Sequence, residues 1–154
     1  VQLNIDGTDL KVIEFAPRVG GGLAFREILM LTGFDMISAV IDSYLNNDVD
    51  VNFVSPAKNE KVSIIHCYGD GGKFDKITGL EKLKDAGIVE EFYIFKKPGD
   101  LLYKNNLASK NRVFGIMILA DSTASQQKKI KIAMSSLSII TKDGRDVLNR
   151  SWSN

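Results

Sequence analysis

The sequence of 154 residues has a single cysteine, no long hydrophobic run and no excess of charge of either sign. One cysteine cannot form a disulfide within the chain and fits the reducing cytoplasm, which is the expected location. No apolar stretch approaches the roughly 20 residues that span a bilayer, and no stretch reads as a secretory signal, so we expect no membrane partner. The net charge of +1 and the lack of lysine or arginine runs predict that nucleic acid is not a partner.

The composition is that of a globular protein, with 44% hydrophobic and 25% charged residues. Its length suits one ordinary domain or two small ones. The sequence starts at Val1, inside the strand-like alternation VQLNI, so we interpret the chain as a fragment of a longer protein. We expect two parts, residues 1–48 and residues 49–154.

Residues 1–16 predict a β-hairpin, because the alternating stretches VQLNI and LKVIEFA flank the turn sequence DGTD. With residues 7–9 as a three-residue loop, Gln2 is predicted to lie directly opposite Glu14, and directly opposed residues share one face of a sheet.

Glu14 ends an apolar strand, where a carboxylate is costly unless it has a partner. Magnesium is a natural partner, since it takes one or two carboxylates together with waters and phosphate oxygens. Gln2, across the hairpin, adds a carbonyl oxygen. We therefore predict Gln2 and Glu14 as magnesium ligands.

A loop suited to phosphate follows in the stretch PRVGGGLAF, residues 17–25. Arg18 offers a planar fork of donors, and Gly20, Gly21 and Gly22 let an anion approach the backbone N–H groups closely. The N-terminus of the helix predicted from about Leu23 also favours anions. Singly, a strand-end glutamate is usually solvated and a triple glycine is usually a flexible turn; the ordered combination favours a nucleotide-phosphate site.

This combination resembles the final metal- and phosphate-binding segment of ATP-grasp enzymes. In that family a Glu or Gln on one strand and a Glu roughly a dozen residues later hold magnesium, and the second Glu opens a Glu-x-Asn-x-Arg motif, matched here by Glu14, Ala16 and Arg18. Alanine offers no oxygen, so we expect water to compensate at Ala16. The Arg-x-Gly-Gly-Gly loop and the text TGFD, residues 32–35, are similar to the branch of L-amino-acid ligases and carbamoyl-phosphate-synthetase-like proteins.

The resemblance implies an α+β fold in which residues 1–48 form the C-terminal end of the ATP-grasp domain, an antiparallel hairpin plus helices. It implies ATP and Mg²⁺ as cofactors, Arg18 as the catalytic residue, and Gly20, Gly21 and Gly22 as phosphate-binding residues. The implied reaction is an ADP-forming ligation of a small carboxylate and an amine through an acylphosphate. The ATP-binding lysines are expected in a missing N-terminal part of the same enzyme, without which this fragment is expected to be inactive.

Residues 49–154 predict a ferredoxin-like β-α-β-β-α-β module from the order of apolar strands and amphipathic helices. His66 and Cys67 are neighbours on a strand and face opposite sides; we interpret Cys67 as a core residue and His66 as a surface or interface residue. The glycine-rich stretch at residues 69–74 predicts a mobile loop.

Two other functions stay open. One is a carbamoyl-phosphate-synthetase-like or biotin-carboxylase-like ATP-grasp enzyme that acts on bicarbonate. The other is a non-catalytic ferredoxin-like module for ligand binding or assembly, in which the hairpin is a dimer edge. A homodimer is a further partner to consider, because the sequence leaves the oligomeric state open.

Overall fold

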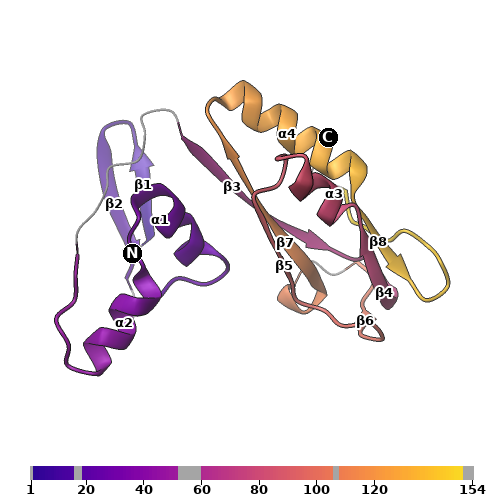
Figure 1. Cartoon of the computed structure of the whole chain (residues 1–154), viewed down its shortest axis with the longest axis horizontal. Helices are drawn as coiled ribbons and strands as arrows, with labels where there is room; N and C mark the ends of the chain where they lie inside the picture. Colours follow the sequence, from indigo (N-terminus) through magenta and orange to yellow (C-terminus); the bar gives the residue numbers. More distant parts are fainter. Residues whose placement is uncertain (1, 16–18, 52–59, 106–107, 151–154) are drawn as a thin grey trace. The chain divides into compact units, whose positions relative to one another are not determined.

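A computed structural model describes residues 2–15, 19–51, 60–105 and 108–150, and of residues 2 and 3 it describes the backbone alone. The chain divides into two compact units, Val1–Ser55 and Pro56–Asn154, each considered by itself (Figure 1). The sequence also predicts a short strand in the stretch VDVNFV at residues 49–54, most of which lies outside the described residues. The predicted boundary after residue 48 stays a prediction.

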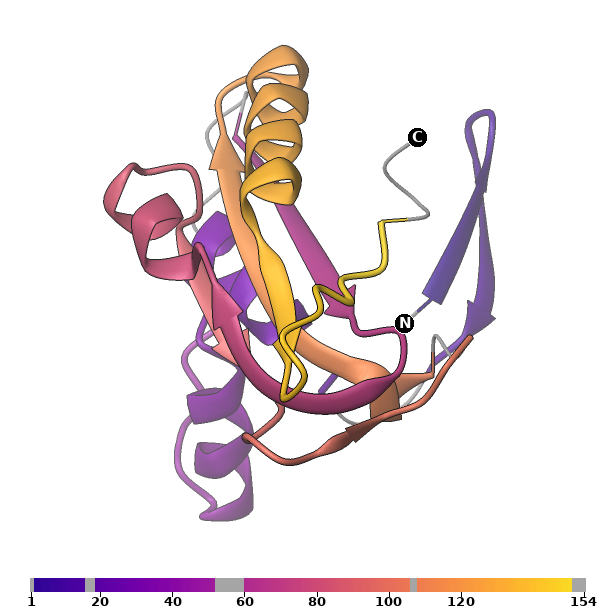
Figure 2. The same ribbon diagram turned by 90° about the vertical axis from the view of Figure 1, so that its right-hand side faces the viewer.

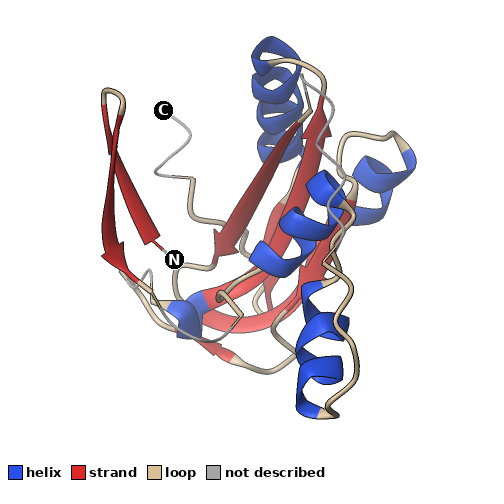
Figure 3. Ribbon diagram, turned by 90° about the vertical axis from the view of Figure 1, so that its left-hand side faces the viewer, coloured by secondary structure: helices blue, strands red, loops and turns tan. Residues whose placement is uncertain are grey.

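The described elements of the first unit are a hairpin and two helices: β1 (Gln2–Asp6), β2 (Asp9–Glu14), α1 (Ala24–Thr32) and α2 (Met36–Tyr44). The hairpin confirms the sequence prediction, and its two strands are joined by a tight turn (Figure 3). The turn consists of Gly7 and Thr8 alone, with Asp6 paired to Asp9. Gly7 has φ of 63°, as a two-residue hairpin turn with glycine at its first central position requires.

A β-bulge changes the register near the open end of the hairpin and so compensates for the shorter turn. Along most of the hairpin the pairing is one residue out of the predicted register, with Leu3 opposite Val12. The register then shifts, so that Gln2 is opposite Glu14 and Ile13 is the extra residue. The predicted three-residue loop is therefore wrong, whereas the predicted pairing of Gln2 with Glu14 is confirmed.

The boundary between the two helices follows the residues of TGFD. Gly33 ends α1 with φ of 71°, a conformation in which its N–H donates to the Leu29 carbonyl oxygen. Asp35 caps α2 by accepting hydrogen bonds from the N–H groups of Ile37 and Ser38, at 3.0 and 3.1 Å. The sequence predicts both caps, since Gly33 can end a first helix and Asp35 can cap a second, and the structure confirms them.

The second unit contains eight regular helices and strands with one 3₁₀ turn in its described part: β3 (Lys61–Tyr68), β4 (Gly72–Thr78), α3 (Leu80–Asp85), β5 (Glu91–Ile94), β6 (Leu101–Leu102), η1 (Ser109–Asn111), β7 (Arg112–Ala120), α4 (Thr123–Ser136) and β8 (Ser138–Thr141). Two antiparallel sheets have the orders β3-β7-β5 and β6-β4-β8. Helix α4 packs on β7 and β3 (Figure 2). The core between these layers includes Phe114, Ile116, Ile118 and Ile139, all fully buried.

The ferredoxin-like order is not confirmed, because β4 intervenes between β3 and α3 and β8 pairs with β4. The prediction of a mobile loop at residues 69–74 is wrong for Gly72–Phe74, which belong to β4. Burial of Phe74, 2% exposed, holds this segment in the sheet. The strand runs on to Thr78, and α3 starts only after Gly79, whose φ of 96° breaks the strand.

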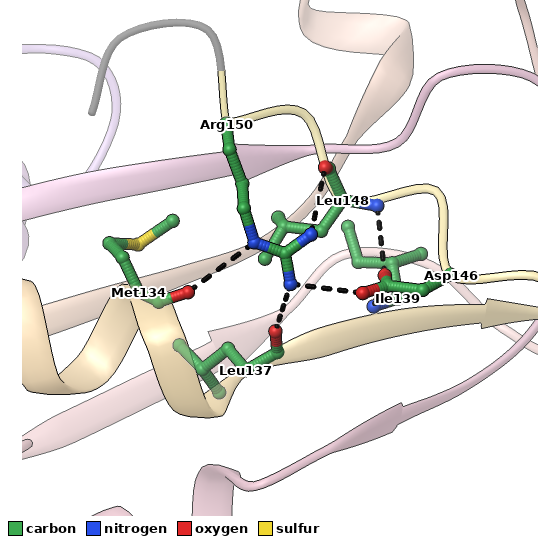
Figure 4. A network of polar contacts seen from close by, with 6 residues as sticks. All are labelled: Met134, Leu137, Ile139, Asp146, Leu148 and Arg150. Carbon is green, nitrogen blue, oxygen red and sulfur yellow. Dashed lines mark hydrogen bonds and ion pairs between the residues drawn. The ribbon is translucent and has the colours of Figure 1, made fainter. Parts of the chain in front are cut away.

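The chain folds back onto β8 after the turn at Asp143 and Gly144, and Arg150 holds this tail in place (Figure 4). Its Nη2 donates to the Leu137 carbonyl oxygen at 2.7 Å and to Asp146 Oδ2 at 2.9 Å. Asp146 Oδ1 accepts from the backbone N–H groups of Ile139 and Leu148, both at 3.1 Å. The guanidinium and the carboxylate together tie the end of α4, β8 and the tail to one another.

Candidate functional site

The bulge on β2 sets the position of the predicted metal ligands. With a two-residue turn and regular pairing, Ile13 would stand opposite Gln2; the extra residue brings Glu14 there instead. Bulges next to functional sites commonly redirect a side chain in this way. Glu14 is exposed at the end of its strand, so its carboxylate is open to a ligand.

Arg18, the predicted catalytic residue, and Ala16, the departure from the family motif, lie outside the described residues. Their roles stay predictions. The described chain resumes at Val19 and leads directly into the three glycines.

The glycine loop is open to solvent and has room above its backbone. Gly20, Gly21 and Gly22 are all exposed. A Cβ at Gly21 would meet no atom within 4 Å, and one at Gly20 would meet only the Ala24 Cβ at 3.6 Å. Gly22 has φ of 70°, which favours glycine. Backbone conformation therefore explains Gly22, whereas packing within the described chain does not explain Gly20 or Gly21. The empty space at Gly20 and Gly21 suits an anion that approaches the backbone.

The N-terminus of α1 differs from that of α2. No side chain caps α1, whose N-cap residue is Leu23, buried at 5% exposure. The α2 N-terminus is instead satisfied by Asp35, and the hydrogen bonds from the backbone and hydroxyl of Ser38 hold the pKa of that carboxyl below its usual value. Helix N-termini attract anions through their exposed N–H groups. The α1 N-terminus, next to the glycine loop, thus has no side-chain cap, although Glu27 lies in its first turn.

An apolar groove of about 560 Å³ begins at Val19, beside the glycine loop. Its other lining residues come from α2 and its flanks: Phe34, Met36, Ala39, Val40, Ser43, Tyr44 and Val49. The groove therefore joins the loop to an apolar face of α2.

The donor set fits magnesium held with the help of a nucleotide. In the part of the chain that the structure describes, no three His, Cys, Asp or Glu side chains gather into a metal site. Magnesium does not need such a site, because it keeps several waters and phosphate oxygens and takes few carboxylates. One exposed carboxylate opposite Gln2, followed by an open amide loop, matches that pattern.

Two solved structures share this fold. An L-amino acid ligase from Bacillus licheniformis has a TM-score of 0.70 and 19% sequence identity, and a phosphoribosylglycinamide synthetase from Anaerococcus prevotii has a TM-score of 0.72 and 16% identity. Each alignment covers 91% of this chain and 36% of the other chain. No family model matches the sequence, and a search of curated proteins finds no match.

Both of these proteins are ATP-grasp enzymes, so the resemblance to that family is confirmed at the level of the fold. The chain is a mixed α/β protein with antiparallel sheets, and its fold matches part of each of these two structures. It spans about a third of the length of the two enzymes.

Cys67 and the helix lengths test two other predictions from the sequence. Cys67 is fully buried, and burial raises the pKa of its thiol to about 12, which confirms a core cysteine. Among the helices that the structure describes, none is long and apolar enough to cross a bilayer.

Sequence reasoning missed Arg112, which lies near His66 in the second unit, because a lone arginine at the start of a strand carries no local signal.

Proposed function

We propose that this chain is part of a cytoplasmic ATP-dependent, ADP-forming ligase that joins a small carboxylate to an amine through an acylphosphate. The observation that carries the proposal is the order of features along residues 2–32. Gln2 stands opposite Glu14, the open loop of Gly20–Gly22 follows, and α1 then begins without a side-chain cap. The fold shared with an L-amino acid ligase supports the same function.

In this proposal Gln2 and Glu14 hold Mg²⁺, which when bound neutralises charge on the phosphates of ATP. A carboxylate oxygen of the substrate attacks the γ-phosphorus, and ADP leaves. The amine then attacks the acyl carbon, inorganic phosphate leaves, and the nitrogen gives up a proton. Arg18 neutralises the phosphoryl group during transfer, and the N–H groups of Gly20–Gly22 bind phosphate oxygens.

We further propose that an N-terminal part of the same enzyme completes the site and covers the exposed apolar side chains of the first unit. These side chains are Ile5, Leu10, Val12, Ile13, Phe15, Ile37, Val40, Ile41, Tyr44, Leu45 and Val51. So many exposed apolar side chains in one small unit, with Tyr44 84% exposed, favour a surface that a partner covers. On this basis the isolated chain binds ATP only weakly, and micromolar binding by calorimetry would contradict the proposal.

The test is a screen of the longer protein that carries this chain, with ADP release measured against pairs of amino acids and small carboxylates. In the active combination, Glu14→Ala is expected to lower kcat by about 10²-fold or more, because a group that stabilises transition-state charge is lost. Arg18→Ala is expected to do the same. Glu90→Ala and Arg145→Ala are matched controls, since both residues are exposed and lie in the second unit.

Near-normal turnover of Glu14→Ala and Arg18→Ala would show that the site assignment is wrong. ADP release with bicarbonate alone, and with no amine, would favour the carbamoyl-phosphate-synthetase-like or biotin-carboxylase-like alternative.

A further inference from the structure

Three side chains of the second unit lie against one another on one sheet: His66 of β3, Phe95 just after β5, and Arg112 at the start of β7. The His66 and Phe95 ring centroids are 6.2 Å apart with a tilt of 54°, and Arg112 Cζ lies 5.8 Å from the Phe95 ring centroid. His66 and Tyr93 both stand opposite Gly115 in their registers. No side chain of β7 therefore lies between His66 and Tyr93.

Two polar atoms in this cluster are buried without a hydrogen-bond partner among the described residues. They are Nδ1 of His66 and Nε of Arg112. A buried donor left unpaired costs roughly 1–3 kcal/mol, and an arginine Nε always carries its proton. Buried polar atoms without a partner are rare in folded proteins, and they often mark a position where a water, an ion or another ligand binds.

The charges around His66 and Arg112 favour a ligand with a single negative charge. Burial, and then the positive charge of Arg112, hold the pKa of His66 below its usual value, so the imidazole is neutral near pH 7. Among the described residues of β3 and β5, Tyr68, Tyr93 and Glu91 are the other ionisable groups on this face of the sheet. The Tyr93 hydroxyl donates to Glu91 Oε2 at 2.5 Å. Arg112 supplies one positive charge near His66, and a single guanidinium matches a monoanion better than a phosphate dianion.

We propose that His66 and Arg112 bind the carboxylate of a small-molecule ligand, whose oxygens accept hydrogen bonds from His66 Nδ1 and Arg112 Nε, while Phe95 contacts the apolar part of that ligand. Guanidinium donors are well suited to carboxylate oxygens, and Phe95 is 43% exposed and so open to contact. The proposal does not depend on the ligase function, because all three residues lie in the second unit.

The test uses the 154-residue chain and its single histidine, whose ¹⁵N chemical shifts report the protonation of His66 alone. Phenylacetate, acetate and inorganic phosphate are the probes, titrated at several pH values. Phenylacetate is expected to raise the pKa of His66, because a bound anion favours the imidazolium. By linkage its dissociation constant then falls as the pH is lowered, about tenfold for each unit by which the pKa rises. Acetate is expected to bind more weakly than phenylacetate because it cannot contact Phe95.

Arg112→Gln is expected to abolish the effect of phenylacetate, and Arg145→Gln, which alters an exposed arginine elsewhere, is expected to leave it unchanged. Phe95→Leu is expected to weaken phenylacetate more than acetate, and this variant serves if Arg112→Gln does not fold. A His66 pKa that no carboxylate moves in the unaltered chain would overturn the proposal. So would tighter binding of phosphate than of phenylacetate, or an equal response in Arg112→Gln.

Discussion

Both units of this chain contain many apolar residues, but these residues are mostly exposed in the first unit and mostly buried in the second. In the first unit neither helix has a buried residue, every residue of β2 is exposed, and Leu23 is the one core-like side chain among the described residues. In the second unit β7 alone contributes a run of fully buried side chains from Val113 to Ile118. The comparison teaches that a buried hydrophobic core stabilises the second unit. In the first unit, turns and helix caps set the secondary structure, and the apolar side chains stay exposed.

The largest expected effect concerns the core of the second unit. Phe114→Ala should lower the free energy of unfolding by about 3–5 kcal/mol, since Phe114 is fully buried and its truncation leaves a cavity. Tyr44→Ala in the first unit should change it by less than about 0.5 kcal/mol, since that ring is 84% exposed. Urea denaturation of the whole chain followed by circular dichroism measures both. Equal losses in the two variants would break the comparison.

A smaller effect is expected where the tail closes on the second unit. Arg150→Ala should lower the free energy of unfolding by about 1–2 kcal/mol, because the Leu137 carbonyl and Asp146 lose their donor. Arg150→Lys should recover only part of the loss, since an ammonium cannot reproduce the planar fork. Urea denaturation at neutral pH measures the series, and no change in either variant would contradict a structural role for the tail.

The free energy of unfolding, measured by urea denaturation as the pH is lowered, tests the role of Asp146 in holding the tail. Burial tends to raise the pKa of Asp146, but the hydrogen bonds from Leu148, Arg150, Ser138 and Ile139 outweigh burial and hold it below the usual value of 3.8. A lowered pKa means that the ionised carboxylate contributes stability above pH 3.8, and that this stability is lost as the pH falls through the folded pKa. Asp146→Asn should therefore lose less stability on acidification than the unaltered chain.

The smallest global effect is expected for the cap of α2. Asp35→Ala should destabilise that helix by about 1 kcal/mol, because the Ile37 and Ser38 N–H groups lose their acceptor. The loss should appear as faster amide hydrogen exchange in α2, with little change in the unfolding of the second unit. Asp42→Ala, near the other end of α2, is the matched control. Cooperative destabilisation of both units by Asp35→Ala would show that they are more strongly coupled than the comparison implies.

Features that depend on a few neighbouring residues could be predicted from the sequence. The hairpin follows from Asp6 and Gly7 between two alternating stretches, and the break between α1 and α2 follows from Gly33 and Asp35. Strands β3 and β7 follow from their apolar runs. Each of these signals acts within a few residues of the chain.

Features that depend on distant contacts could not be predicted. The glycines before Phe74 suggest a loop, but pairing of Phe74 with Thr141 and burial of its ring make that segment a strand. The partnership of β4 with β8 has no local signal for the same reason. In the candidate site, the residue types and the Gln2–Glu14 pairing could be predicted, but the bulge could not, since turn length and register are set together by the whole hairpin.

Because of the bulge at Ile13, the number of residues in the hairpin determines which side chain stands opposite Gln2. Deleting one residue from β2 between the turn and Glu14 would bring Phe15 opposite Gln2 if the bulge persisted, whereas inserting one would bring Ile13 there. Only a compensating pair of changes, such as a third turn residue together with loss of Ile13, would restore an acid at that position. Descendants of this sequence are thus expected to gain and lose hairpin residues in matched steps, and engineers who graft a new turn here must count residues before they choose them.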